Sequence, residues 1–207
     1  MSLASSMTKT PTPIALYAQH MQEIKHRLEV IDFFLQMNGN ALYVQSTVES
    51  VCLQFRKVLE LIAFASMIAN KKAYSSVYDD FSKHHKADLL LKDLRRVNPN
   101  FYPIPIQTKS KIVDGIHSSE LVVEAYLTQD DFVYVFKKCS ALLHVPNPFG
   151  GRVGLPFYQK SFPDWRIKIM RLLNSHQVHF VDDDNMWVIN MQEEGDSYVH
   201  YYTFTPQ

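Results

Sequence analysis

One short stretch, 137-KKCSALLHVPNPFGG-151, combines a residue suited to acid–base chemistry with residues suited to phosphate binding. His144 ends a helical pattern that two prolines terminate, and Lys137 and Lys138 precede it in the same pattern. An imidazole exchanges protons near neutral pH, and a nearby ammonium group stabilises negative charge that develops on a phosphate. The stretch therefore predicts a site that binds or acts on a phosphate group.

A structural role would also explain this histidine. A protonated imidazole at the end of a helix interacts favourably with the terminal carbonyl groups. A neutral imidazole can instead lie in a core with both ring nitrogens satisfied. Both interpretations of His144 remain open on the sequence.

Arg56 and Glu60 are the second pair of interest, because they lie four residues apart on a predicted helix. As an ordinary ion pair they would stabilise the helix by about 0.2–0.5 kcal/mol. Alternatively, both side chains face the interior beside His144, where Arg56 contacts a phosphate and Glu60 orients the imidazole. Asn147 is a second candidate for orienting His144. A buried charged pair is costly unless it has further partners.

Other polar groups have simpler explanations. His176 and His179, with the acidic residues 182–184, could bind a metal, but alternation along a predicted strand accounts for them better. Arg171 lies five positions before His176, and a match at this spacing is expected by chance in a chain of this length. We therefore expect neither a metal nor a cofactor. The aromatic residues of 198–204 could stack on bases, although alternation between core and solvent explains them more simply.

Bulk composition excludes some classes of protein. Lysine plus arginine and aspartate plus glutamate number 21 each in 207 residues, so a strongly basic surface that coats nucleic acid is not expected. With 46% apolar residues the chain can bury a core. Cys52 and Cys139 lie in apolar helical patterns and are expected to be buried free thiols. No segment has the apolar length of a membrane span, so we expect a cytoplasmic protein with no membrane contact.

The elements that position these residues are mainly helical. Apolar residues spaced by three and four predict a helix from 14 to about 37, closed by Asn38 and Gly39. A second helix, which carries Arg56 and Glu60, forms an antiparallel hairpin with the first. The predicted helices after the first span 42–70, a less regular 74–97, 129–145, and 161–175.

The end of the chain changes to a period of two. Three such runs predict a small antiparallel meander, at 177–181, 186–191 and 198–205. Residues 103–128 fit either short strands or a structured loop. We predict a mainly α protein: a flexible tail at 1–13, an antiparallel helical bundle at 14–175, and a three-stranded meander packed on it at 176–207.

Two stretches, 54-QFRKVLELIAF-64 and 142-LLHVPNPF-149, together with the long helical hairpin, resemble HEPN domains. These domains are helical bundles of prokaryotic toxin, phage-defence and nucleotide-binding proteins. Catalytic members are metal-independent endoribonucleases that carry an arginine, four to six residues, and then a histidine near a helix end. The resemblance covers 14–175 as architecture and the two quoted stretches as sequence.

The resemblance implies a homodimer that engages RNA or a nucleotide, in a toxin or defence system with an antitoxin or another protein partner. His144 would act as general acid or base on the ribose 2′-hydroxyl or the leaving oxygen. Lys138 and Arg56 would stabilise phosphate charge, and Glu60 or Asn147 would orient the imidazole. Lys138 stands where the family has arginine, and lysine cannot grip a phosphate through two parallel hydrogen bonds. This departure favours the alternative of a non-catalytic module that binds a protein or a nucleotide.

Overall fold

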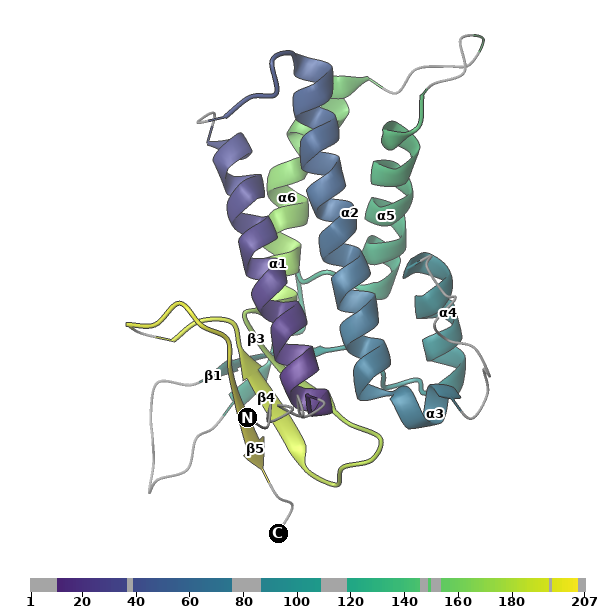
Figure 1. Cartoon of the computed structure of the whole chain (residues 1–207), viewed down its shortest axis with the longest axis vertical. Helices are drawn as coiled ribbons and strands as arrows, with labels where there is room; N and C mark the ends of the chain where they lie inside the picture. The colour runs from purple at the N-terminus through teal and green to yellow at the C-terminus, as the bar shows by residue number, and fades with distance from the viewer. Residues whose placement is uncertain are drawn as a thin grey trace, which may run out of the picture.

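Four long helices run alternately up and down, and an antiparallel sheet closes one end of them (Figure 1). The computed structural model describes residues 11–36, 39–75, 87–108, 119–145, 149, 154–193 and 195–204. The helices are α1 (Pro13–Leu35), α2 (Val44–Ala69), α3 (Lys71–Ser75), α4 (Ala87–Val97), α5 (Gln129–Leu143) and α6 (Leu155–Leu173). The protein is therefore mainly helical, as predicted.

The first two helices form the predicted antiparallel hairpin. Thr12 caps α1 by accepting a hydrogen bond from the backbone N–H of Ala15, and Pro13 occupies the first turn, where no partner for its nitrogen is needed. The predicted apolar stripe of α1 is buried in its middle, while its end members Ile14 and Leu35 are half-buried. The buried residues of the stripe are Tyr17, Met21, Ile24, Leu28 and Ile31.

An aromatic contact in the core joins α2 and α6. The ring of Phe55 lies 5.5 Å from that of Phe162 and 5.7 Å from that of Trp165, measured between centroids. A bidentate ion pair adds a polar tie at the edge of the core: Arg166 on α6 donates to both carboxylate oxygens of Asp32 on α1, at 2.5 and 2.6 Å. Paired hydrogen bonds of this kind fix orientation as well as adding stability.

The sheet has five strands, in the order β2-β1-β3-β4-β5, and every neighbouring pair is antiparallel. The predicted meander is present as its last three strands, but the prediction of a three-stranded sheet is wrong. Residues 103–128, which fitted either strands or a loop, supply two more strands beside β3. The strands are β1 (Ile104–Thr108), β2 (Ser119–Leu121), β3 (Ser175–His179), β4 (Met186–Asn190) and β5 (His200–Phe204).

The last helix also differs from its prediction. We expected a helix to begin at Ser161, because a serine two residues before a proline resembles a helix start. Instead α6 begins at Leu155 and continues through Pro163, while the hydroxyl of Ser161 donates to the backbone carbonyl of Phe157 at 2.8 Å. Pro156, one residue after the helix start, is the proline that marks it.

Other boundaries fall partly outside the described residues. The predicted irregular helix at 74–97 includes the end of α3 and all of α4, and residues 76–86 between them lie outside. Only 11–13 of the predicted tail are described. Within the part of the chain that the structure describes, no helix has both the length and the apolar character that crossing a bilayer requires.

The contact of Phe55 with α6 gives a prediction about stability. Replacing fully buried Phe55 with alanine removes its contacts with α6 and leaves a cavity, so the free energy of unfolding in urea should fall by about 3–5 kcal/mol. The matched control, Leu53→Ala on the exposed side of the same helix, should change it by less than about 1 kcal/mol. Equal losses of unfolding free energy in the two variants would show that the contact of Phe55 with α6 does not stabilise the core.

Candidate functional site

Arg56 and Glu60 form an ion pair that faces α5. The Nε of Arg56 donates to Oε1 of Glu60 at 3.0 Å, and the Nζ of Lys57 donates to Oε2 at 3.0 Å. The guanidinium carbon of Arg56 lies 5.5 Å from the ring centroid of Phe136 on α5. Both oxygens of the Glu60 carboxylate thus have partners on α2, and the group carries a net charge of +1 at the rim of the bundle.

Lys138 lies on the other flank of α5, beside α6. Its Nζ is 5.5 Å from the ring centroid of Tyr134 and 5.3 Å from that of Phe157, so two aromatic faces stabilise the ammonium group. Helical geometry explains the separation from Arg56. Residues 136 and 138 are rotated by about 200° around the helix axis, so the side chain that meets Arg56 and the side chain of Lys138 point to nearly opposite sides.

His144 is the C-cap residue of α5, with an extended backbone (φ −88°, ψ 142°) and an exposed side chain. It lies eight residues beyond Phe136, or about 12 Å along the helix axis. Asn147 lies outside the described residues. The structure therefore brings Arg56 and Glu60 together, but within one chain Lys138 and His144 lie away from them. The catalytic roles of these residues stay predictions.

His176, the alternative histidine of the chance motif with Arg171, is fully buried in the core. One ring nitrogen, Nδ1, lies 2.9 Å from the backbone carbonyl of Leu173, and Nε2 lies 2.9 Å from the hydroxyl of Tyr17. The neutral ring satisfies both contacts by donating to the carbonyl and accepting from the hydroxyl. Burial lowers the pKa of His176 from 6.5 to about 4. With both nitrogens used, His176 has none left for a metal or a substrate.

The two cysteines are free and buried, as predicted. A hydrogen bond with Cys52 is the main cause that raises the pKa of Cys139 far above its ordinary value, and burial raises it further. Cys139 therefore remains a thiol at neutral pH and is not suited to act as a nucleophile.

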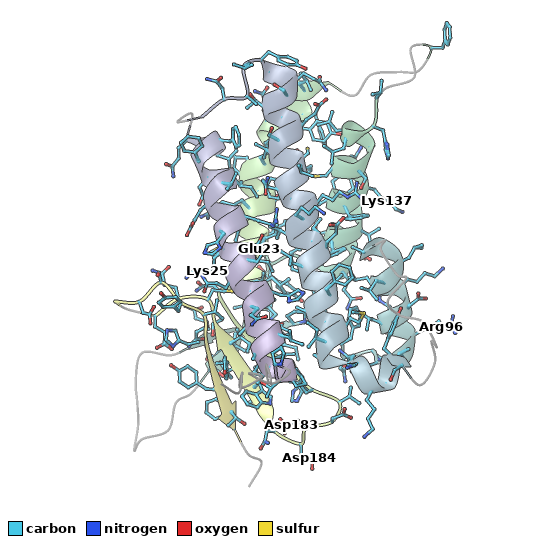
Figure 2. All side chains as sticks on the ribbon, in the orientation of Figure 1. Glu23, Lys25, Arg96, Lys137, Asp183 and Asp184 are labelled. Carbon is cyan, nitrogen blue, oxygen red and sulfur yellow. The ribbon has the colours of Figure 1, made fainter. Side chains whose placement is uncertain are left out.

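A basic groove between α4 and α5 brings together residues that the sequence did not single out as one site. This hollow, of about 470 Å³, is bordered by three cations, Lys92 and Arg95 from α4 and Lys137 from α5. Among its lining residues Asp130 is the one carboxylate. In Figure 2, Lys137 of α5 and Arg96, which follows Arg95 on α4, project from the same side of the molecule. The full lining is Leu89, Leu91, Lys92, Arg95, Gln129, Asp130, Val133 and Lys137.

The charges of this groove are only partly explained by helix stability. Arg95 lies in the last turn of α4, where a cation interacts favourably with the helix dipole, and its Nε donates to Gln129 at 2.6 Å. Lys92 lies one turn earlier on the same side of α4, and like charges at this spacing are unfavourable. Lys137 adds a third cation from another helix. Cations that converge across a hollow are suited to an anionic ligand.

His144 does not line the groove, but it caps α5, the helix that carries Lys137. Lys137 and His144 are seven residues apart, so the helical repeat places them on the same side of α5, about 10 Å apart along the axis. The cation that shares a side with the imidazole is thus Lys137 and not Lys138. The sequence contains two signals for this arrangement, the spacing of seven between Lys137 and His144 and the basic run 92-KDLRR-96.

No protein-family model, curated protein or solved structure matches this chain. The two stretches quoted above therefore remain the basis of the resemblance to HEPN domains.

The buried histidine generates a prediction of pH dependence. Between pH 6.5 and about 4, the unfolded chain binds a proton at His176 that the folded chain does not bind. The stability that depends on neutral His176 is thus fully present above pH 6.5 and is lost as the pH falls, by roughly 1.4 kcal/mol per pH unit. Urea unfolding at pH 6.5, 6.0, 5.5 and 5.0 measures this slope, before most carboxylates titrate.

The matched controls are His176→Gln, which should lose the slope, and His26→Ala on the exposed side of α1, which should keep it. A wild-type free energy of unfolding that stays constant from pH 6.5 to 5.0 would contradict the assignment of a buried neutral ring.

Proposed function

We propose that the protein binds RNA or a nucleotide in the basic groove between α4 and α5. The observation that carries this proposal is that three cations, Lys92, Arg95 and Lys137, line one hollow. Asp130 is the one carboxylate among the lining residues. A phosphate group satisfies these cations, and the apolar lining residues of the groove, such as Leu89 and Val133, offer a surface to a base or a ribose. A local basic site is compatible with a chain of zero net charge.

We further propose that a bound strand follows α5 from Lys137 toward His144. The distance of about 10 Å along the axis is short enough for one RNA strand to contact both residues. The exposed imidazole could then accept the proton of a ribose 2′-hydroxyl, whose oxygen attacks the adjacent phosphorus. The bond from phosphorus to the 5′-oxygen breaks, the protonated imidazole returns its proton to that oxygen, and the products are a 2′,3′-cyclic phosphate and a 5′-hydroxyl. No metal takes part in this metal-independent endoribonuclease reaction of a toxin or phage-defence protein.

The second candidate is a non-catalytic module that binds a protein or a nucleotide. Its support is the end of the bundle that lies opposite the sheet, where several large apolar side chains are exposed. Leu42 is 96% exposed and has a φ of 71°, a strained conformation for a leucine. Exposed apolar patches and backbone strain are both typical of interaction sites. The apolar side chains are Leu42, Tyr43, Val44, Val145 and Phe149.

Salt dependence tests the binding site. If three cations contact phosphates, the logarithm of the affinity for a fluorescent single-stranded oligoribonucleotide should fall with the logarithm of the KCl concentration with a slope of about −2. Lys137→Gln should reduce the magnitude of the slope by about 0.7, because one phosphate contact is lost. The readout is fluorescence anisotropy over a KCl series.

The control is Lys160→Gln, which removes an exposed cation from α6 and should leave the slope unchanged. Equal effects of the two substitutions, or the absence of binding by the wild type, would overturn the groove as the binding site.

Cleavage in EDTA tests the chemistry. The wild type should cut a labelled RNA to products with 2′,3′-cyclic phosphate ends, and His144→Ala should slow the reaction by about 100-fold or more, because a general acid or base is lost. His26→Ala is the control and should cleave at the wild-type rate. Binding without cleavage in the wild type would support the non-catalytic alternative, and equal cleavage by wild type and His144→Ala would overturn the role of this histidine.

A further inference from the structure

Strand β5 ends the sheet and has an open edge. Among the described strands it pairs with β4 alone, so the backbone groups along its other side have no strand partner. Its sequence is His200-Tyr201-Tyr202-Thr203-Phe204, and three of these side chains, Tyr201, Tyr202 and Phe204, are 42–43% exposed. Aromatic and β-branched residues of this kind favour strand pairing.

The two edges of the sheet differ in a way that points to a role for β5. Proteins protect edge strands from pairing with other chains by making them short or by placing charges or prolines on them. The opposite edge, β2, has both protections: it is three residues long and carries Glu120. Strand β5 has five residues and contains no lysine, arginine, carboxylate or proline.

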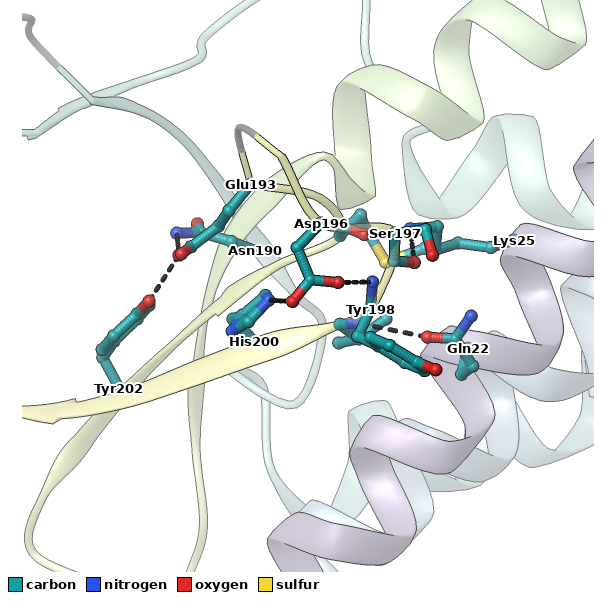
Figure 3. Close-up of polar contacts among 11 residues, drawn as sticks. Gln22, Lys25, Asn190, Glu193, Asp196, Ser197, Tyr198, His200 and Tyr202 are labelled. Atoms are coloured by element: carbon teal, nitrogen blue, oxygen red, sulfur yellow. Dashed lines mark hydrogen bonds and ion pairs between the residues drawn. The ribbon is translucent and has the colours of Figure 1, made fainter.

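A network of hydrogen bonds holds β5 in place (Figure 3). The hydroxyl of Tyr202 donates to Glu193, and the Nε2 of His200 lies 3.1 Å from Oδ2 of Asp196. The preceding segment is tied to α1, because Gln22 accepts a hydrogen bond from the backbone N–H of Val199 at 3.1 Å. The strand is therefore ordered before any partner binds, which lowers the entropic cost of association.

Lys25 strengthens this attachment from the same helix. Its Nζ donates to the backbone carbonyl of Met191 at 2.8 Å and to that of Ser197. Both ends of the connection between β4 and β5 are thus anchored on α1, and the open edge keeps a fixed orientation relative to the bundle.

We propose that β5 pairs edge to edge with β5 of a second copy of the chain, as antiparallel strands related by a two-fold axis at Tyr202. In the register that pairs all five residues, Tyr202 lies opposite itself, Tyr201 opposite Thr203, and His200 opposite Phe204. These are aromatic–aromatic and aromatic–β-branched pairs of the kind that stabilise sheets, and no two carboxylates or lysines face each other. The strand is therefore complementary to its own copy, and pairing produces a continuous ten-stranded sheet.

This dimer is independent of the proposed binding of RNA. It joins the chains through the sheet and not through the helix ends that the resemblance to HEPN domains implies. Strand β5 and helix α4 lie on different sides of the molecule in Figure 1, so pairing leaves the basic groove open.

Measurement of mass in solution tests the interface. By light scattering after size-exclusion chromatography, the wild type should have twice the chain mass of 24.0 kDa. Phe204→Lys, which places a cation opposite His200 of the second copy, should shift the mass to that of a monomer. The matched control, Leu121→Lys on the exposed opposite edge, should remain a dimer. A monomeric wild type would overturn the proposal and would leave the edge open to a strand of another protein.

Cross-linking tests the register. Directly opposed residues of antiparallel strands have Cα atoms about 4.5–5.5 Å apart, which suits a disulfide. Tyr202→Cys should therefore form a covalent dimer under copper–phenanthroline oxidation, and Leu121→Cys should not. Because Cys52 and Cys139 are buried, the introduced thiol is the reactive one. A wild-type dimer that persists in Phe204→Lys, combined with no cross-link in Tyr202→Cys, would place the interface elsewhere.

Discussion

A buried hydrogen bond between Tyr17 of α1 and His176 of β3 joins the sheet to the helices inside the core. His176 lies opposite Pro105 of β1 and opposite Ile189 of β4, so the contact with Tyr17 is made from the middle strand of the sheet. Because the ring is fully buried, it must be neutral to be stable there. The role of His176 is therefore structural. The titratable groups that a ligand could reach lie at the rims of the bundle.

The charged residues follow from this arrangement. The interior surfaces of α1, α2, α5 and α6 are apolar and aromatic, and ion pairs such as Asp32 with Arg166 lie at the margins of the core. Helix α4 is short and packs against α2 and α5, beside the four long helices of the bundle. The boundary between α4 and α5 is therefore where cations of two helices can border one hollow.

Local periodicity was sufficient to predict much of the fold. The stripe of α1 and its hairpin with α2 depend on neighbours in the sequence, and both are present. The start of α6 was missed because Pro163 suggested a helix start, whereas the helix begins at Leu155 and continues through this proline. Strands β1 and β2 were undecided because they are short, and β1 pairs with a strand far along the chain.

The candidate site was less predictable for a similar reason. The spacing of four identified Arg56 and Glu60 as a pair, but the direction of Lys138 depends on the rotation of α5 against its neighbours. The groove requires knowledge of which helix lies beside α5. A ladder with Ile104 opposite Gln177 has a kinetic consequence as well. Closing so long a loop has a high entropic cost, so during refolding the helices should form before the ladder between β1 and β3.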